Sequence, residues 1–289
     1  ELVASVTIAT DEAGLPDRHR RGKGVADAPL SLKGMRVLVT EDNVINQELV
    51  RKFLDRAGIV VEMANHGGEA LALLSQHSYQ AVLMDCQMPV MDGYEATRRI
   101  REELKLHALP VIAMTANALI GDRELSLQAG MNDYITKPID ARVLYQTLEK
   151  YCGQPSVSVA EAGAPAPSAV GAPAEASQVL NPAPAIAAMG DDEELYAAVV
   201  AMFLSSEADF PHRFSTALTG GDLTGATRHA HTLKGVAASL GAERVQHSAA
   251  RLEQACRQGL PAEAAFAETR AELATLIALL QENYPKTDA

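Results

Sequence analysis

One stretch, residues 81–93, constrains the fold of this chain more than any other. An apolar run of strand length ends on a carboxylate, Asp85, and turn residues follow from Pro89 to Gly93. A short apolar run bounded in this way predicts a strand buried on both faces, as in a parallel sheet. Open α/β sheets bind ligands at the carboxyl ends of such strands, so Asp85 stands where a ligand would bind. Taken alone, Asp85 fits a helix cap or a turn residue as well.

The segment around this stretch alternates strand and helix patterns. The predicted strands are residues 36–40, 60–64, 81–85, 111–115 and 134–135. Helical spacing between and after them predicts helices at 45–57, 68–74, 94–104, 121–129 and 141–151, the last capped by Asp140. Five strands that alternate with helices predict a doubly wound, five-stranded parallel α/β sheet over residues 35–151.

The rest of the chain has a different composition. Residues 1–34 are polar, with Arg and Gly clustered near residue 20, which predicts a tail or linker in which residues 1–8 form a short strand. Residues 152–180 are rich in Ala, Pro, Ser and Val, which predicts a partly extended linker. Residues 181–289 show only helical patterns from residue 191 onward, including one from Asp222 to Gly241, which predicts an all-α four-helix bundle.

Composition excludes several classes of function. The 289 residues carry a net charge of -12, which argues against nucleic acid as a partner because phosphate binding needs a basic face. There is no signal peptide, no apolar run of membrane-spanning length and no basic amphipathic helix, so this segment is expected to make no membrane contact. Three scattered cysteines make neither a disulfide framework nor a metal site, which favours a reducing, cytoplasmic setting.

Polar residues gather at the carboxyl ends of the predicted strands. Glu41 and Asp42 follow the first strand, Asp85 ends the third, Thr115 ends the fourth, and Lys137 follows the fifth. Carboxylates placed on one edge repel one another, and a divalent cation such as Mg²⁺ would relieve the repulsion. A carboxylate nucleophile beside a hydroxyl, an ammonium group and Mg²⁺ suits in-line phosphoryl transfer. The alternatives are that Thr115 is a turn residue and Lys137 a solvated surface lysine.

A second candidate site lies in the helical region, at His229-Ala-His231-Thr-Leu-Lys234-Gly235. The two histidines lie on different faces of a helix, which argues against a metal pair. At about 100° per residue, His231 lies roughly 130° from the apolar stripe and His229 roughly 70°, so His231 is predicted to be exposed and His229 structural. Lys234 can steady a phosphate, and Gly235 leaves room for a partner at a cost of about 1 kcal/mol. The alternative is a solvated helix face.

Residues 35–151 resemble a response-regulator receiver domain. The matching residues are Glu41-Asp42, Asp85 with Met88-Pro89 and Met91-Asp92-Gly93, Thr115-Ala116, and Lys137-Pro138. The resemblance implies a flavodoxin-like fold in which Asp85 is the phosphoacceptor and Thr115 and Lys137 contact the phosphoryl group. It also implies that Glu41, Asp42, Asp85 and the backbone carbonyl of Gln87 hold Mg²⁺. Tyr134 matches a switch aromatic, with simple packing as the alternative.

Residues from about 180 to 284 resemble a histidine-phosphotransfer (HPt) domain, through the string from Ala230 to Gly241. The resemblance implies that His231 carries a phosphoryl group, supported by Lys234 and Gly235. The domain order resembles the C-terminal part of a tripartite hybrid sensor histidine kinase. Because the first residue is Glu, we expect a missing upstream kinase region; the parent would be an inner-membrane sensor kinase with this segment on its cytoplasmic side.

These observations predict a phosphorelay. The phosphoryl group would pass from a histidine of the upstream kinase core to Asp85, then to His231, then to a separate response regulator. No P-loop or glycine-rich ATP lid is present, so the chain is not expected to phosphorylate itself from ATP. The alternatives are an Asp-nucleophile phosphohydrolase, which would want an acid where Gln87 stands, a scaffold that transfers nothing, and a free-standing relay protein.

Overall fold

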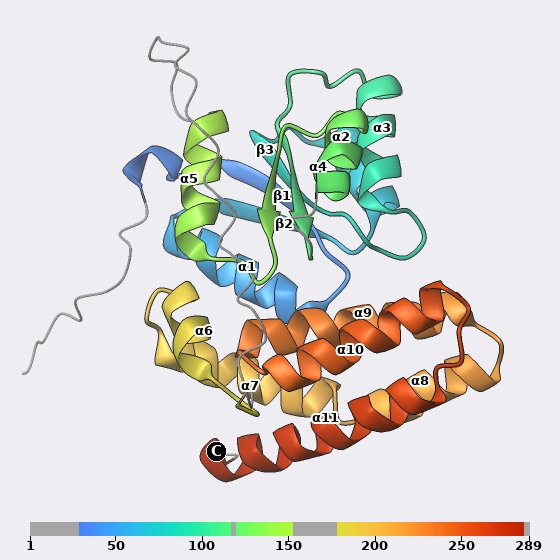
Figure 1. The fold of residues 1–289 in the computed structure, drawn as a ribbon. Coiled ribbons are helices and arrows are strands. Elements are labelled where there is room, and N and C mark those ends of the chain that lie inside the picture. Colours follow the sequence, from blue (N-terminus) through green and yellow to red (C-terminus); the bar gives the residue numbers. More distant parts are fainter. Residues whose placement is uncertain (1–28, 117–119, 153–177, 286–289) are drawn as a thin grey trace, which may run out of the picture.

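The structure, a computed structural model, describes residues 29–116, 120–152 and 178–285 (Figure 1). The strand predicted at residues 1–8 and nearly all of the predicted linker lie outside the described residues. The described chain begins with a short 3-10 helix, Leu30–Leu32, and continues into a sheet region and then a helical region.

All five predicted strands form one parallel sheet. Its strands are β1 (Arg36–Thr40), β2 (Val60–Ala64), β3 (Ala81–Asp85), β4 (Val111–Thr115) and β5 (Asp133–Thr136), in the order β2-β1-β3-β4-β5. Every residue of β3 and β4 is buried, which explains why these strands read as unbroken apolar runs. The predicted doubly wound α/β architecture is therefore confirmed.

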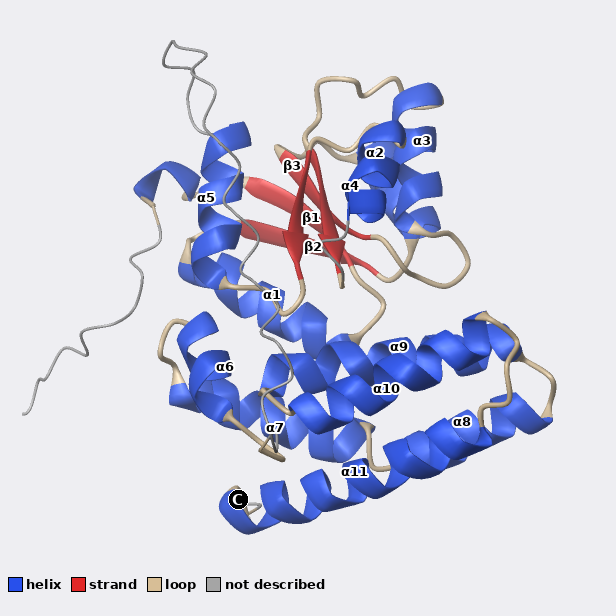
Figure 2. Cartoon of the chain, in the orientation of Figure 1, coloured by secondary structure: helices blue, strands red, loops and turns tan. Residues whose placement is uncertain are grey.

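Helices cover both faces of the sheet (Figure 2). They are α1 (Val44–Arg56), α2 (Gly67–Gln76), α3 (Gly93–Glu102), α4 (Ile120–Gln128) and α5 (Ala141–Cys152). Alternate side chains of β3 pack on opposite faces of the sheet. Leu83 packs in the core with α1 and α5, whereas Val82 and Met84 pack with α2 and α3. The predicted cap of α5 is confirmed, because Asp140 Oδ1 accepts a hydrogen bond from Arg142 N at 2.8 Å.

The C-terminal region is entirely helical within the described residues. Its helices are α6 (Pro182–Ala188), α7 (Glu193–Ser206), α8 (Phe210–Thr219), α9 (Leu223–Leu240), α10 (Glu243–Arg257) and α11 (Glu263–Asn283). Helix α9 packs against α8 and α10, and α10 packs against α11, so the predicted all-α bundle is present. The sequence pattern did not predict α6 or α8. None of the described helices combines the length and apolar character needed to cross a bilayer.

The sheet region lies against the helical region through α1. Helix α1 contacts α7, and the apolar core on the α1 and α5 side of the sheet continues into the bundle. In Figure 2 the strand arrows point toward α9 and α10, so the carboxyl edge of the sheet faces the bundle. This arrangement brings the two candidate sites toward each other.

Candidate functional site

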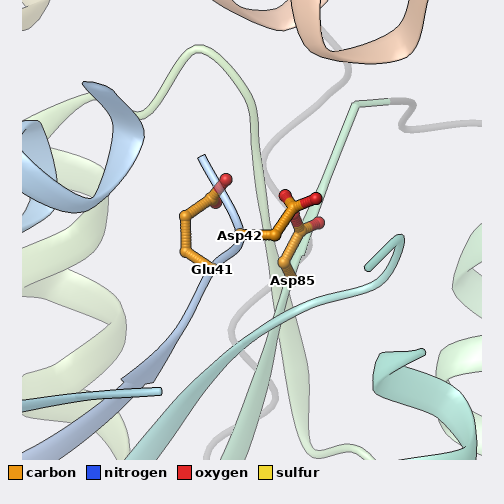
Figure 3. Close-up of side chains that lie close together, drawn as sticks. All are labelled: Glu41, Asp42 and Asp85. Carbon is orange, nitrogen blue, oxygen red and sulfur yellow. The ribbon is translucent and has the colours of Figure 1, made fainter. Parts of the chain in front are cut away.

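Three carboxylates meet at the carboxyl edge of the sheet (Figure 3). One ligand oxygen from each of Glu41, Asp42 and Asp85 lies within 4.8 Å of the other two. Glu41 and Asp85 are buried and Asp42 is half-buried. Adjacent strands produce the cluster, because β1 pairs with β3 and Thr40 stands opposite Met84 in the register. The closeness predicted for these three side chains is therefore confirmed.

Local contacts fix the orientation of the cluster. Asn43 caps α1, and Asn46 Nδ2 in its first turn donates to Glu41 Oε1 at 2.9 Å. At Gly93, an added Cβ would lie 2.2 Å from the backbone oxygen of Asp85. A glycine at this position therefore lets the start of α3 approach the end of β3 closely.

Lys137 is the counter-ion of the cluster. Its Nζ donates to Glu41 Oε2 and to Asp85 Oδ2, both at 2.7 Å, and its side chain is only 7% exposed. The alternative of a solvated surface lysine is therefore wrong. The backbone N–H of Lys137 donates to the carbonyl of Thr115 at 2.7 Å, so Thr115, itself buried, lies beside the same site.

Burial and mutual repulsion shift the acids of the cluster. Burial raises the pKa of Asp85 to about 7; Glu41 adds to the rise and Lys137 opposes it. Burial and Glu41 likewise raise the pKa of Asp42 to about 6. Burial acts to lower the pKa of Lys137, but Asp85 and Glu41 outweigh it and raise that pKa above its ordinary value. One ammonium group against three carboxylates leaves an all-oxygen site short of positive charge, which fits a hard divalent cation.

The second candidate site lies between α9 and α10. His231 Nδ1 lies 2.9 Å from Glu253 Oε1, and Lys234 Nζ donates to Glu253 Oε2 at 2.6 Å. Arg257, one turn further along α10, also donates to Glu253. The sequence analysis missed Glu253. The signal was a glutamate inside the apolar stripe of α10, in which Val245, Ala249, Leu252 and Cys256 are buried.

His231 is not exposed as predicted. Its side chain is 14% exposed, because α10 supplies a facing carboxylate and the receiver lies near enough for the charge of Lys137 to act on the ring. The prediction was wrong because it considered only the apolar stripe of the helix that carries His231. His229 is half-buried, and burial together with Arg213 and Arg228 lowers its pKa.

The surroundings of His231 disfavour the charged form of its ring, and its Nδ1 is the ring nitrogen that contacts Glu253. Burial lowers the pKa of His231, and Lys234 and Lys137 add to this, against the opposing effect of Glu253. Burial acts to raise the pKa of Glu253, but hydrogen bonds and charges from His231 and Lys234 lower it to about 2. An ionised Glu253 can only accept, so the network assigns the ring proton to Nδ1 and leaves the lone pair on Nε2.

Contacts across the two regions bring the sites face to face. Arg257 Nη2 donates to Gln87 Oε1 at 2.7 Å, and Gln87 N donates to Asp85 Oδ1 at 3.2 Å. The charge of Lys137 reaches His231, and that of Arg228 on α9 lowers the pKa of Asp42. The acid cluster and the imidazole therefore share one electrostatic environment.

Comparison with protein families identifies both regions. A family model described as "Response regulator receiver domain" matches residues 37–149, and one described as "Hpt domain" matches residues 198–283. These matches cover the sheet with its five helices and most of the helical bundle, respectively.

The similar proteins include large kinases and a solved receiver. The chain is 39% identical over 161 residues to Probable histidine kinase 2 of Oryza sativa subsp. indica, covering 50% of the chain and 15% of that protein. It is 41% identical over 128 residues to the sensor protein GacS of Pseudomonas syringae pv. syringae, covering 43% of the chain and 14% of GacS. The receiver domain of sensor histidine kinase PA1611 from Pseudomonas aeruginosa, solved with a magnesium ion in its active site cleft, is 44% identical in sequence. That match has a TM-score of 0.40 and covers 41% of this chain and 98% of the solved chain.

The chain thus spans about 15% of the length of the first curated relative. Its two matched families are domains of phosphorelay signalling, and its similar proteins include the hybrid signal transduction histidine kinase I of Dictyostelium discoideum. The chain belongs to the two-component phosphorelay proteins in which a response regulator receiver domain is followed by an Hpt domain.

Proposed function

We propose that this chain relays a phosphoryl group from Asp85 to His231. One observation carries the proposal: Arg257 of the Hpt region contacts Gln87, two residues after Asp85, and also Glu253, the partner of His231. The two candidate phosphoacceptors are therefore connected within one chain by a continuous set of hydrogen bonds. This connection is expected if the receiver and the Hpt region dock during phosphoryl transfer.

In the receiver, Asp85 acts as the nucleophile. Its carboxylate oxygen attacks the phosphorus of an incoming phosphohistidine, the P–N bond breaks, and an acyl phosphate forms. Lys137, released from Asp85, would pair with the new phosphoryl oxygens, and Thr115 would donate to them. Glu41, Asp42, Asp85 and the backbone carbonyl of Gln87 would hold Mg²⁺. The bound cation would neutralise charge that develops on the phosphoryl oxygens.

In the Hpt region, Nε2 of His231 acts as the next nucleophile. It attacks the phosphorus of the acyl phosphate, the P–O bond breaks, and the carboxylate of Asp85 returns to Lys137. Throughout this step, Nδ1–H stays hydrogen-bonded to Glu253, whose charge stabilises the cationic ring as it forms. Lys234 lies beside the same carboxylate and is positioned to pair with the transferred phosphoryl group.

The kinase relatives support a proposal for the wider setting of the chain. We propose that the phosphoryl group enters from a histidine in the kinase core of a hybrid sensor histidine kinase, in the same polypeptide, and leaves to the receiver of a separate response regulator. We place this segment on the cytoplasmic side of a bacterial inner-membrane kinase. A phosphohydrolase remains disfavoured, because Gln87 stands where it would need an acid and bonds Arg257 instead.

The proposal is tested with a radiolabelled small-molecule phosphodonor and Mg²⁺. The wild-type chain should carry both an acyl phosphate and an acid-labile phosphohistidine, Asp85→Asn should carry neither, and His231→Gln should carry only the acyl phosphate. His229→Gln is the matched control and should label like the wild type. Normal labelling of Asp85→Asn, or steady phosphate release with no labelled protein, would contradict the relay.

A further inference from the structure

An ion pair joins the receiver to the turn between α6 and α7 of the helical region. Arg56, in the last turn of α1, donates to the carbonyl of Met189 at 3.1 Å and forms an ion pair with Asp192. Asp192 is also the N-cap of α7, since its side chain accepts from Leu195 N at 2.8 Å. The α6–α7 turn therefore presents both a carbonyl and a carboxylate to one guanidinium group. We call Arg56, Met189 and Asp192 the clasp.

The clasp lies at the interface between α1 and α7, where the packing is incomplete. Between α1 and α7 runs an open groove of about 450 Å³, whose lining includes Val44, Glu48, Ala198 and Met202. A second polar contact between the described parts of the two regions, Arg257 with Gln87, involves side chains that stay largely exposed. The two regions share an apolar core, but the groove leaves part of their interface unfilled, so the polar contacts beside it help to set the orientation of the two regions.

The docked receiver covers the face that a separate receiver would need. His231 is 14% exposed, and Gln87 of the receiver is bonded to Arg257 one turn from Glu253. Any other receiver has to bring its own phosphoacceptor to the same Nε2 of His231. The chain's own receiver and an outgoing receiver therefore exclude each other.

We propose that the clasp controls which receiver holds the His231 face. While it is closed, it favours transfer within the chain and blocks transfer to or from a separate receiver. The occupant of the face is the chain's own receiver, and its competitor is a second receiver with a basic residue at the end of its own first helix. This inference rests on the proposed function and adds its regulation.

The first measurement is transfer within one chain. In chains with both phosphoacceptors intact, Arg56→Ala and Asp192→Ser should slow the appearance of label on His231 by about three- to fivefold, as expected for a partly exposed ion pair. Serine retains the N-cap of α7, so Asp192→Ser removes the ion pair without removing the cap. The double variant should be no slower than either single one, and the label on Asp85 should keep its rate.

The second measurement is transfer between chains. An Asp85→Asn chain can receive label on His231 only from the receiver of another molecule, supplied by a His231→Gln chain with a distinguishing size tag. Adding Arg56→Ala to the Asp85→Asn chain should speed its labelling by about three- to fivefold, because its own receiver leaves the face more often. Adding Asp192→Ser to the Asp85→Asn chain should not speed its labelling, because the Arg56 of the incoming receiver then also lacks its carboxylate partner.

Arg98→Ala is the matched control, since Arg98 pairs with Glu95 inside the receiver, on α3. It should change neither rate. A gain between chains together with a loss within the chain supports the clasp, since damage to the fold would slow both. If Arg56→Ala slows both reactions or behaves like Arg98→Ala, the inference is overturned while the relay stands. If the wild-type chain never labels His231, the proposed function fails first.

Discussion

Glu253 and His231 stand 22 residues apart on neighbouring helices, with Oε1 and Nδ1 separated by 2.9 Å. The same carboxylate also accepts hydrogen bonds from Lys234 and Arg257, so one buried acid holds the imidazole and two cationic side chains. The proton on Nδ1 and the lone pair on Nε2 are consequences of this single contact.

Removing Glu253 should change the state of the His231 ring. In Glu253→Ala, Nδ1–H loses its acceptor, so the ring should exchange between its two neutral tautomers and label more slowly. The unpaired groups should also lower the free energy of unfolding by about 1–3 kcal/mol. Ring ¹⁵N chemical shifts measure the tautomer directly. His229 in the same spectra is the internal control, and an unchanged Nδ1–H tautomer at His231 would show that Glu253 does not set it.

Lowering the pH should reduce the free energy of unfolding of the Hpt region, in part because Glu253 becomes protonated. Its folded pKa of about 2 lies below its ordinary 4.5, so its contribution to stability is complete above about pH 4.5 and is lost as pH falls toward 2. That contribution is on the order of 3 kcal/mol. Urea unfolding from pH 6 to pH 2 should therefore show a shallower acid loss in Glu253→Gln than in the wild type. Glu268→Gln, at an exposed ion pair with Arg251, should follow the wild-type curve; parallel curves for all three would refute the assignment.

Lys137 should matter most when Mg²⁺ is absent. Lys137→Met leaves Glu41 and Asp85 buried without a counter-ion, which should cost about 3–5 kcal/mol in EDTA. Millimolar Mg²⁺ should recover part of this loss, because the cation and the ammonium group neutralise the same carboxylates. Thermal unfolding with and without Mg²⁺ measures both effects. The control is a sodium salt at equal ionic strength, without divalent cations. An equal loss of stability in EDTA and in Mg²⁺ would argue against a cation site here.

Two glycines should respond in opposite ways to alanine. At Gly93 the added Cβ would strike the Asp85 carbonyl, so Gly93→Ala should destabilise the receiver by roughly 1–3 kcal/mol and slow labelling of Asp85. At Gly235 an added Cβ meets no heavy atom of the described residues within 4 Å, apart from its own stretch of helix, even with the receiver docked. Gly235→Ala should therefore stabilise α9 by about 0.5–1 kcal/mol and leave transfer unchanged.

A larger side chain tests whether Gly235 leaves room for a partner. Gly235→Gln should keep most of the helix stability gained with alanine but slow transfer to His231, since its side chain would extend toward the docking face. Circular dichroism melts and labelling rates separate the two effects. Equal transfer rates for glycine, alanine and glutamine would mean that this glycine has no role in docking.

The sequence was most informative about the sheet region. Strands β1, β3 and β4 are short and largely buried, so the apolar run and the terminal polar residue of each are visible in the primary structure. The convergence of Asp42 and Asp85 follows from parallel topology alone. The role of Tyr134 stays a prediction: its side chain packs partly buried beside the core formed with α2 and α3.

The sequence was least informative where distant helices meet. Glu253 reaches His231 only because of the register between α9 and α10, which periodicity within one helix does not encode. Helix α6 begins at Pro182 inside an Ala- and Pro-rich stretch that reads as a linker, and it packs on α7 and α9. The pairing of Arg56 with Asp192 depends on how two folded regions meet, which no local pattern describes.

The placement of Arg56 and Asp192 on one polypeptide has a consequence for inheritance. A change in either residue can be matched by a change in the other within the same gene, without any alteration in a second protein. Paired substitutions of this kind would make the residues at this contact differ from those used by related signalling proteins in the same cell. The surface that joins the two halves of the relay can thereby insulate the pathway from unwanted cross-talk.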